Sequence, residues 1–277
     1  MLPKIRRPRA GLAPRWSGAA AALGALLLLA LPARAQTAGE RARDRGGLGE
    51  THLILNYACK PENRVEFRRY METTGVDQFE RWKKDGVMTS YLILFSSFVN
   101  EKLPDMWIFL DFAKFVDVEK WQAVEREHPG GLSAEGLKLA RPLACVYSDL
   151  GWQGGKPNPE VSKSLWMIIP YLVLTDPNKY EDFVNRYIVP QVKGWVKSGI
   201  MHTYSIFLDQ NPTNSPWESL LVFEYDGMRG IALRDVVKQS QRDTLQKDPG
   251  YKHYSPIKLT IRKELQPTTF YPILPKG

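Results

Sequence analysis

One stretch of this chain of 277 residues occurs twice. Residues 82–95 read WKKDGVMTSYLILF and residues 195–208 read WVKSGIMHTYSIFL, so the two align without a gap at an offset of 113 residues. The same offset places the acidic residue Asp111 on Glu224. A fixed offset of this kind indicates an internal duplication. We therefore expect two similar halves that carry the same elements of secondary structure in the same order.

The first 35 residues have the three parts of a secretory signal peptide. They contain six basic residues and no acidic residue, an apolar run at residues 19–31, and small residues before a cleavage site at Gln36. The apolar run is too short to span a bilayer comfortably, which favours cleavage over the alternative of an uncleaved anchor. We predict a signal peptide, no stable membrane insertion after cleavage, and an exported protein that is periplasmic or secreted. Residues 36–50 are expected to form a flexible lead-in.

The net charge does not indicate nucleic-acid binding. The formal net charge is +8, but the six basic residues of the N-terminal segment account for most of it, and 32 basic against 30 acidic residues are left without them. No basic stripe interleaved with aromatic residues is left in that remainder, so no nucleic-acid partner is expected. The hydrophobic content of 43% is typical of a packed globular protein.

The pattern of apolar residues and breakers predicts the elements of each half. In the first half, residues 51–150, we expect strands at 52–59, 87–95, 105–112 and 144–150 and helices at 61–84, 116–127 and 133–140. In the second half, residues 165–265, we expect strands at 165–173, 200–208, 218–225 and 257–265 and helices at 177–196 and 230–246. The order βαββαβ is that of the ferredoxin-like unit.

Glycine and proline mark the boundaries of these units. Residues 151–164 are rich in Gly, Pro and Ser and are expected to form a linker. Residues 266–277 contain too many prolines for regular structure and should form an extended C-terminal tail. Pro190, inside the long helix of the second half, predicts a break near Ile188.

The third strand of the first half is apolar on both faces. Trp107 and Phe109 point one way, while Ile108 and Leu110 point the other. A lone ferredoxin-like sheet has helices on one face and water on the other, which should give alternating apolar and polar residues. Another surface must therefore cover the second face, and the sheet of the other half is the nearest one. The sequence predicts an α+β fold in which two sheets close into a small barrel with helices outside.

The duplicated unit, with its Trp-x-Lys-x-Gly-(Val/Ile)-Met motif, resembles the dimeric α+β barrel superfamily. That group includes NIPSNAP-like, EthD-like and antibiotic-biosynthesis-monooxygenase-like proteins, and also chlorite-dismutase-like haem proteins in duplicated form. The resemblance covers roughly residues 51–265 and implies two tandem ferredoxin-like repeats packed as a pseudo-dimer. Its motifs are topological rather than catalytic, so a likeness of fold does not assign a function.

The same resemblance implies a disulfide. In the ferredoxin-like sheet the last strand of a unit lies antiparallel beside the first, with Cys59 at the end of one and Cys145 at the start of the other. Antiparallel neighbours lie within the Cα distance that a disulfide accepts. We predict a Cys59–Cys145 bridge, with two buried free thiols as the alternative.

His202 is the first candidate for catalysis because it breaks the repeat, where the first half has Thr89. It shares a strand face with Tyr204, and the matching face of the first half carries Tyr91. If this face lines the barrel, His202 is a candidate general base in an apolar cavity, with the two tyrosines orienting a substrate. The alternative is a histidine at a strand end that packs or meets solvent.

Six further residues are predicted to contact a ligand in that cavity: Thr89, Ile93, Ile206, Trp107, Asp111 and Glu224. Asp111 and Glu224 are matched acids at the ends of the two central strands. They could polarise His202 or bind a cation. The alternative is that they cap a turn or pair with a nearby basic residue.

Metal and cofactor signals are weak in this sequence. It contains no HxH, HExxH or CxxC motif, so we expect no metal site and no cofactor. The alternative is haem held by His128, because chlorite-dismutase-like proteins use a helical histidine. The Pro-Gly-Gly that follows His128 indicates a helix terminus instead.

Three functions are compatible with these features. The first is an exported barrel that binds a small apolar or aromatic molecule. The second is a cofactor-independent monooxygenase-like or isomerase-like enzyme with His202 as its base. The third is a structural protein with a filled barrel that serves assembly. A homo-oligomer is compatible with all three.

Overall fold

Eight strands pair into a closed antiparallel barrel in the computed structural model, which describes residues 49–213 and 215–275. The barrel strands are β1 (Thr51–Cys59), β2 (Ser90–Ser96), β3 (Met106–Phe112), β4 (Ala140–Gly155), β5 (Leu165–Val173), β6 (Met201–Asp209), β7 (Ser219–Tyr225) and β9 (Thr268–Ile273). Their order is β7-β6-β4-β1-β3-β2-β9-β5, and β5 pairs with β7 to close the ring. The short strand β8 (Arg262–Glu264) pairs with β5.

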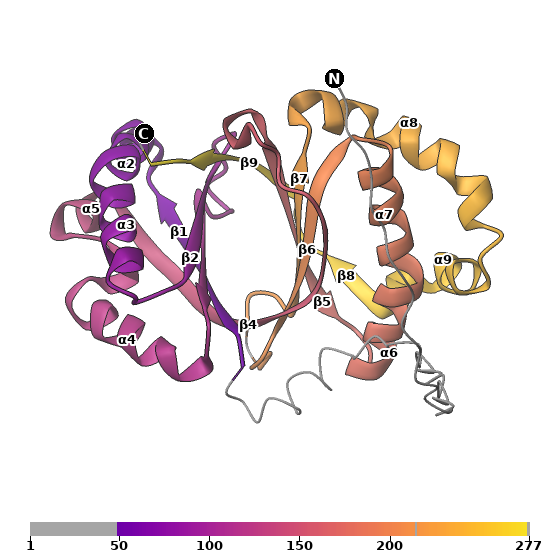
Figure 1. The fold of residues 1–277 in the computed structure, drawn as a ribbon, viewed down its shortest axis with the longest axis horizontal. Helices are drawn as coiled ribbons and strands as arrows, with labels where there is room; N and C mark the ends of the chain where they lie inside the picture. The colour runs from indigo at the N-terminus through magenta and orange to yellow at the C-terminus, as the bar shows by residue number, and fades with distance from the viewer. Residues whose placement is uncertain (1–48, 214, 276–277) are drawn as a thin grey trace, which may run out of the picture. The chain divides into compact units, whose positions relative to one another are not determined.

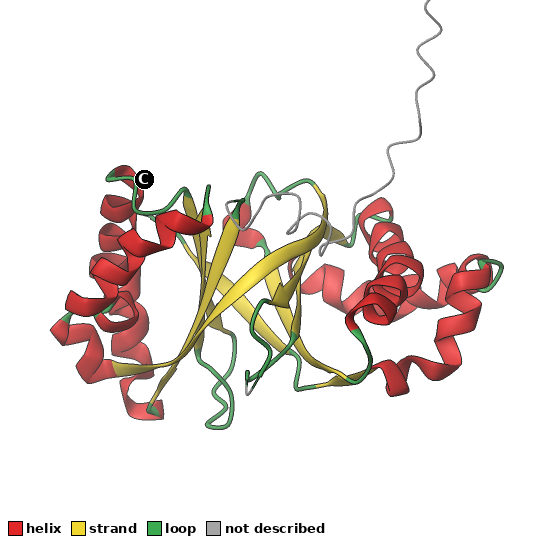
Figure 2. Cartoon of the chain, turned by 90° about the horizontal axis from the view of Figure 1, so that it is seen from below, coloured by secondary structure: helices red, strands yellow, loops and turns green. Residues whose placement is uncertain are grey.

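Helices cover the outside of the barrel in two groups (Figures 1 and 2). The first group is α2 (Arg64–Tyr70), η2 (Met71–Gly75), α3 (Val76–Lys84), α4 (Val118–Glu127) and α5 (Ala134–Leu139). The second group is α6 (Pro177–Phe183), η6 (Val184–Ile188), α7 (Val189–Lys197), α8 (Gly227–Leu245) and α9 (Pro249–Ile261). Short 3-10 turns lie at Pro61–Asn63, Phe115–Asp117, Pro129–Gly131 and Val161–Lys163.

Side chains alternate between the two faces of each strand, so the apolar residues form three cores. The first core lies between the sheet and the helices of the first half, the second core lies between the sheet and the helices of the second half, and the inner core lies inside the barrel. On β3, Ile108 and Leu110 pack with the helices of the first half, whereas Trp107 and Phe109 point into the barrel. The inner core joins strands of both halves and consists of Ile54, Leu94, Trp107, Phe109, Val146, Ile168, Phe207, Trp217, Leu220, Val222 and Phe270. The predicted α+β barrel, with two sheets closing on each other and helices outside, is confirmed.

The C-terminal segment supplies the strand that closes the barrel between β2 and β5. We expected residues 266–277 to form a tail without regular structure, and for β9 that prediction is wrong. Phe270 of β9 is fully buried in the inner core. Of the three prolines that argued against a strand, Pro267 and Pro275 lie outside β9 and Pro272 lies one residue from its end.

The predicted strand at residues 257–265 is mostly helix, because α9 continues to Ile261 and only Arg262–Glu264 form β8. The side chain of Asp248 caps α9 by accepting a hydrogen bond from the Tyr251 amide at 2.8 Å. Tyr251 and Tyr254 then bury against the second helix-facing core. This packing overrides the β propensity of the residues that follow, since strand propensity depends strongly on context.

β4 runs through the first five residues of the predicted linker 151–164. Its first part pairs with β1 and its second part with β6, so one long strand belongs to both halves of the barrel. At the second junction between the halves, β8 and β9 make the connection that β4 makes at the first. β8 and the start of β9 pair with β5 of the second half, and the end of β9 pairs with β2 of the first half.

The long helix of each half breaks at the same point. The π turns η2 and η6 lie at residues 71–75 and 184–188, which the offset of 113 relates. The predicted break near Ile188 is confirmed. Pro190 is not its cause, because the first half makes the same turn with Asp77 in that position.

The two cysteines are free, so the predicted disulfide is wrong. Cys59 lies opposite Ala140, while Cys145 lies opposite Leu55. Because β1 and β4 are antiparallel, four residues of strand separate the two positions, or about 13 Å at 3.3 Å per residue. A disulfide requires Cα atoms within about 7 Å. The strands are neighbours, as predicted, but their register keeps the thiols apart.

The predicted signal peptide, residues 1–35, lies outside the described residues, as does nearly all of the predicted lead-in. Within residues 49–213 and 215–275, no helix combines the length and the apolar content that a membrane crossing needs.

We predict two free thiols in the unreduced chain after denaturation. In the folded chain, burial and the Asp105 carboxylate raise the pKa of the Cys59 thiol to about 12. Its reactive thiolate is therefore scarce at pH 8. Alkylation at pH 8, followed by peptide mass spectrometry, should leave Cys59 unlabelled in the native chain and labelled in denaturant. If neither cysteine is labelled in denaturant, the two form a disulfide and this prediction is wrong.

We predict that Phe270→Ala lowers the free energy of unfolding by about 3–5 kcal/mol, the usual cost of removing a buried ring. The matched control is Tyr271→Ala on the same strand, where the side chain is only partly buried. Urea unfolding followed by circular dichroism measures both variants. A loss for Phe270→Ala no larger than for the control would mean that β9 does not close the inner core.

Candidate functional site

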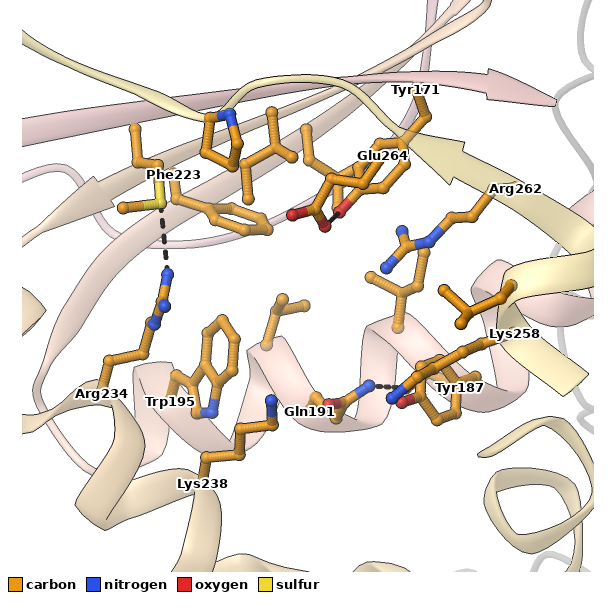
Figure 3. Close-up of a pocket in the computed structure, with 17 residues that line it drawn as sticks. Tyr171, Tyr187, Gln191, Trp195, Phe223, Arg234, Lys238, Lys258, Arg262 and Glu264 are labelled. Carbon is orange, nitrogen blue, oxygen red and sulfur yellow. Dashed lines mark hydrogen bonds between the residues drawn. The ribbon is translucent and has the colours of Figure 1, made fainter. Parts of the chain in front are cut away.

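A cavity of about 380 Å³ lies in the second half, between the outer face of the barrel and its helices (Figure 3). β5 and β7 form its floor, η6 and α7 form one wall, and residues of α8 and α9 lie at its edges. The strand residues Met167, Leu221 and Phe223 line it, and all three belong to the helix-facing core rather than to the inner core. The cavity is therefore outside the barrel.

In the first half, aromatic rings fill the corresponding space. Trp82 meets Phe79 edge to face at 5.2 Å between ring centroids and Trp121 at 5.5 Å. Phe79 and Trp121 stack on each other at 6.0 Å. Gly131 approaches this cluster so closely that a Cβ atom there would lie 2.8 Å from the Trp121 ring. The first half is therefore closely packed at this point.

The offset of 113 places Val192, Trp195 and Arg234 where the first half has Phe79, Trp82 and Trp121. All three residues of the second half line the cavity. The tryptophan is kept, but one ring becomes a short aliphatic side chain and the other becomes a guanidinium. The cavity thus occupies a place that two buried rings fill in the other half.

The helix that carries Arg234 keeps the register of its counterpart. Val118 and Val124 of α4 pack on the first core, and their counterparts Ile231 and Val237 of α8 pack on the second. Arg234 lies between these two positions and faces the sheet, as Figure 3 shows. An arginine at an inward-facing position is costly unless its charge is solvated or paired.

Four basic side chains border the cavity. Arg234 and Lys238 lie one helical turn apart on α8, while Lys258 of α9 and Arg262 of β8 come from the C-terminal segment (Figure 3). Glu264 is the one acidic residue of the lining. The cavity thus combines an apolar floor with a net positive charge.

Glu264 is engaged by a neighbour. Its Oε2 accepts a hydrogen bond from the Tyr171 hydroxyl at 2.6 Å. Burial raises the pKa of Tyr171, Arg262 lowers it, and the bond to Glu264 raises it further, so that it lies well above its usual range. The Arg262 guanidinium stacks over the Tyr171 ring at 3.9 Å from its centroid. Tyr171 is therefore a protonated donor that holds the single carboxylate in place.

The catalytic group predicted from the sequence does not assemble. Tyr91 packs with the helices of the first half, where its hydroxyl donates to Glu80 Oε1 at 2.7 Å. Tyr204 packs with the helices of the second half. His202 stands near the start of β6, with its Nε2 atom 3.7 Å from Asp226 Oδ1. The premise that these residues share a face lining the barrel is wrong, and that His202 acts as a base stays a prediction.

The matched acids, Asp111 and Glu224, accept hydrogen bonds from side chains of the neighbouring strands. Asp111 accepts hydrogen bonds from the Ser90 hydroxyl and from His52 Nδ1, the latter at 2.7 Å. Glu224 is fully buried and accepts from the Thr203 hydroxyl at 2.9 Å, and Ser90 and Thr203 are themselves related by the offset of 113. A second hydroxyl, that of Ser164, donates to Glu224 at 2.7 Å. Both acids therefore hold neighbouring segments together through duplicated contacts.

The remaining predicted ligand contacts are dispersed. Ile93 and Ile206 face the helices of different halves, and Trp107 lies in the inner core. Thr89 is exposed, and its hydroxyl donates to the Asp111 carbonyl at 2.9 Å. None of the residues singled out from the sequence lines the cavity. These residues therefore do not form one shared site inside the barrel, and that any of them contacts a ligand stays a prediction.

The residues that line the cavity were missed, although the sequence contained a signal for them. The repeat breaks at Val192 and at Arg234, where large rings of the first half are lost, as clearly as it breaks at His202. Lys258 and Arg262 were hidden by the wrong strand prediction for residues 257–265.

The cavity does not fit a haem held through histidine. Haem iron needs an axial His, Cys, Met or Tyr ligand. The lining has no His or Cys. The sulfur of Met167 lies 3.5 Å from Arg234 Nη1, Tyr171 is bonded to Glu264, and Tyr187 stacks on Tyr251 at 4.8 Å between ring centroids. His128, the residue considered from the sequence, instead packs against Trp82 in the first half at 5.8 Å between ring centroids. That the chain works without a cofactor stays a prediction.

Among the residues that the structure describes, no three His, Cys, Asp or Glu side chains cluster in a way that could hold a metal ion.

The sequence matches no family model and no curated protein. The structure is similar to several solved structures. An anthrone oxidase-like protein is 12% identical with a TM-score of 0.54, over 86% of this chain and 93% of its own. A provisionally named monooxygenase from Fusobacterium nucleatum subsp. nucleatum ATCC 25586 is 11% identical with a TM-score of 0.51, over 82% of this chain and 93% of its own.

A second provisionally named monooxygenase, from Lactobacillus acidophilus NCFM, is 14% identical with a TM-score of 0.50, over 82% of this chain and 95% of its own. At such low identity the likeness establishes the fold and no activity. The chain shares with these proteins the fold of a closed eight-stranded antiparallel barrel with helices outside.

Proposed function

We propose that the cavity of the second half binds a small, largely apolar or aromatic molecule, and that binding is the function of this chain. One observation carries the proposal: the cavity lies where the duplicated half is filled by Phe79 and Trp121. Its volume of about 380 Å³ falls within the range of small-molecule sites, roughly 300–1,000 Å³. A floor of Met167, Leu221 and Phe223 suits an apolar body.

The free-energy cost of losing two buried rings supports a cavity retained for a function rather than a packing defect. Removing a buried Phe or Trp from a core costs about 3–5 kcal/mol, a large fraction of the stability of a typical domain. The replacement at Trp121 is not a smaller apolar residue that would reduce this cost, but Arg234. A bound ligand would restore the lost contacts and stabilise the folded state by mass action.

An enzymatic role is the second candidate. Two of the similar structures bear names that propose monooxygenase activity. His202 beside Asp226 is the histidine–carboxylate pair that such a role would use. Neither residue is part of the cavity lining, and the one carboxylate that is, Glu264, accepts the Tyr171 hydrogen bond. Binding without turnover is therefore the better-supported function.

The structural alternative has less support. The inside of the barrel is filled by an aromatic core, as that alternative required. The cavity outside the barrel has no place in a purely structural role. A homo-oligomer is compatible with the proposal but is not needed to complete the cavity.

We also propose that the two halves are tandem ferredoxin-like repeats. Support comes from the π turns at residues 71–75 and 184–188 and from the left-handed glycines Gly86 and Gly199, with φ of 71° and 73°. Export is part of the same proposal and rests on residues 1–35 of the sequence.

We predict that Val192→Phe, which restores the ring of the first half, abolishes binding of the neutral aromatic probe N-phenyl-1-naphthylamine. The same variant should gain about 0.5–2 kcal/mol of stability, as cavity-filling changes commonly do. Probe fluorescence, excited through Trp195 in the cavity wall, measures binding, and thermal unfolding measures stability.

The reciprocal variant is the control. Phe79→Val should lose about 1–3 kcal/mol of stability and leave probe binding in the second half unchanged. Binding that survives in Val192→Phe at the level of the unchanged chain would place the ligand elsewhere.

We predict that the full chain, expressed in a bacterial host, is recovered outside the cytoplasm with Gln36 as its first residue. N-terminal sequencing and intact mass measure this directly. Ala35→Arg, which removes the small residue next to the cleavage site, should leave the precursor uncut. An intact N-terminus on the unchanged chain, recovered from the cytoplasm, would refute export.

A further inference from the structure

We infer that the ligand of the second-half cavity is an amphipathic organic anion, with one carboxylate-type or sulfonate-type acid group on an apolar body. This inference rests on the proposed function. It names the chemical class that the cavity selects, and the acid group lies against the basic rim, defined as Arg234, Lys238, Lys258 and Arg262.

The charge of the lining is the first ground. Four cations border a cavity that contains one carboxylate, and that carboxylate already accepts a hydrogen bond from Tyr171. Within residues 49–213 and 215–275, no carboxylate lies within 4 Å of the Lys238 or the Lys258 ammonium. Cations that converge on an apolar cavity without carboxylates to neutralise them favour an anion there.

Arg234 Nε lies 3.7 Å from the exposed carboxylate of Asp235, but both arginines also have guanidinium nitrogens without a strong acceptor. Arg234 Nη1 donates to the Met167 thioether at 3.5 Å, which is a weak acceptor compared with an oxyanion. Its positive charge also acts on Tyr225: burial raises the pKa of Tyr225 more than Arg234 lowers it, and the net pKa is about 12. Arg262 Nη1 is buried with no hydrogen-bond partner among the described residues. A planar guanidinium fork suits an acid group with two or three oxygens.

The duplication supplies an independent ground. The counterpart of Lys238 in the first half is Glu125, whose Oε1 accepts a hydrogen bond from the Gly130 amide at 2.8 Å. The counterpart of Arg234 is the buried Trp121. Both positions that face the cavity from α8 have therefore become basic, and one has changed the sign of its charge. Lys238 is exposed at the edge of the cavity and Arg234 is partly buried, so the two charges extend from the solvent to the cavity.

The arrangement sets the shape of the ligand. The apolar floor lies on β5 and β7, while the cations come from α8, α9 and β8 (Figure 3). An apolar body would lie on the sheet beside Trp195, and its acid group would point toward the helices.

A matched pair of probes tests the inference. N-phenyl-1-naphthylamine is neutral, and 8-anilino-1-naphthalenesulfonate carries the same rings with one sulfonate. We expect the folded chain to bind the sulfonate at least about tenfold more tightly, and this difference should shrink as salt screens the rim. Fluorescence titration of both probes, at low and high salt, measures the two affinities.

Lys238→Gln and Lys258→Gln should each weaken sulfonate binding by about tenfold, because each removes a charged hydrogen-bond donor. Both variants should bind the neutral probe within about twofold of the unchanged chain. Lys252→Gln is the control, because Lys252 is exposed on α9 and does not line the cavity. It should leave both affinities unchanged.

The other outcomes separate the two proposals. Equal affinity for both probes, with no effect of either lysine variant, would overturn the anion class while leaving the apolar site intact. Failure of both probes to bind the unchanged chain would overturn the proposed function itself. Sulfonate binding that survives in Val192→Phe would place the anion outside this cavity and would also refute the inference.

Discussion

The inner core of the barrel is the constraint on which the rest of this structure depends. Each half brings strands that are apolar on both faces, and only the strands of the other half can cover the faces that the helices leave free. Trp107 and Phe109 from the first half meet Phe207 and Trp217 from the second, and Phe270 of the last strand completes the packing. Side chains of this core occupy the inside of the barrel, and the cavity of the second half lies outside it, between sheet and helices.

Duplication makes that outer space a natural place for a function to arise. Once the inner core holds the halves together, one helix–sheet interface can maintain stability while the other changes. The first half keeps the rings of Phe79, Trp82 and Trp121, whereas the second keeps only Trp195 of the three and gains Arg234. Under the proposed function, the first half would supply stability and the second half would supply binding at the corresponding place.

The sequence predicted the barrel because the features that specify it are local. The apolar faces of the strands and helix stops such as Gly86 can be read from neighbouring residues, and the offset of 113 residues can be read by aligning the chain with itself. Register and long-range pairing cannot be read in this way. Cys59 and Cys145 lie on adjacent strands as expected but four positions apart, and β9 is a strand only because β2 and β5 flank it. The site was missed for a related reason: which face of β2 and β6 meets the helices depends on one residue of register.

A crystal structure of the chain with N-phenyl-1-naphthylamine tests the central claim most directly. The account predicts density for the rings on the floor formed by β5 and β7, against Val192 and Trp195 and below Arg234. The claim would be contradicted by density for the probe inside the barrel or at the aromatic cluster of the first half. It would also be contradicted if a crystal that holds the probe at saturating concentration showed no defined density for it.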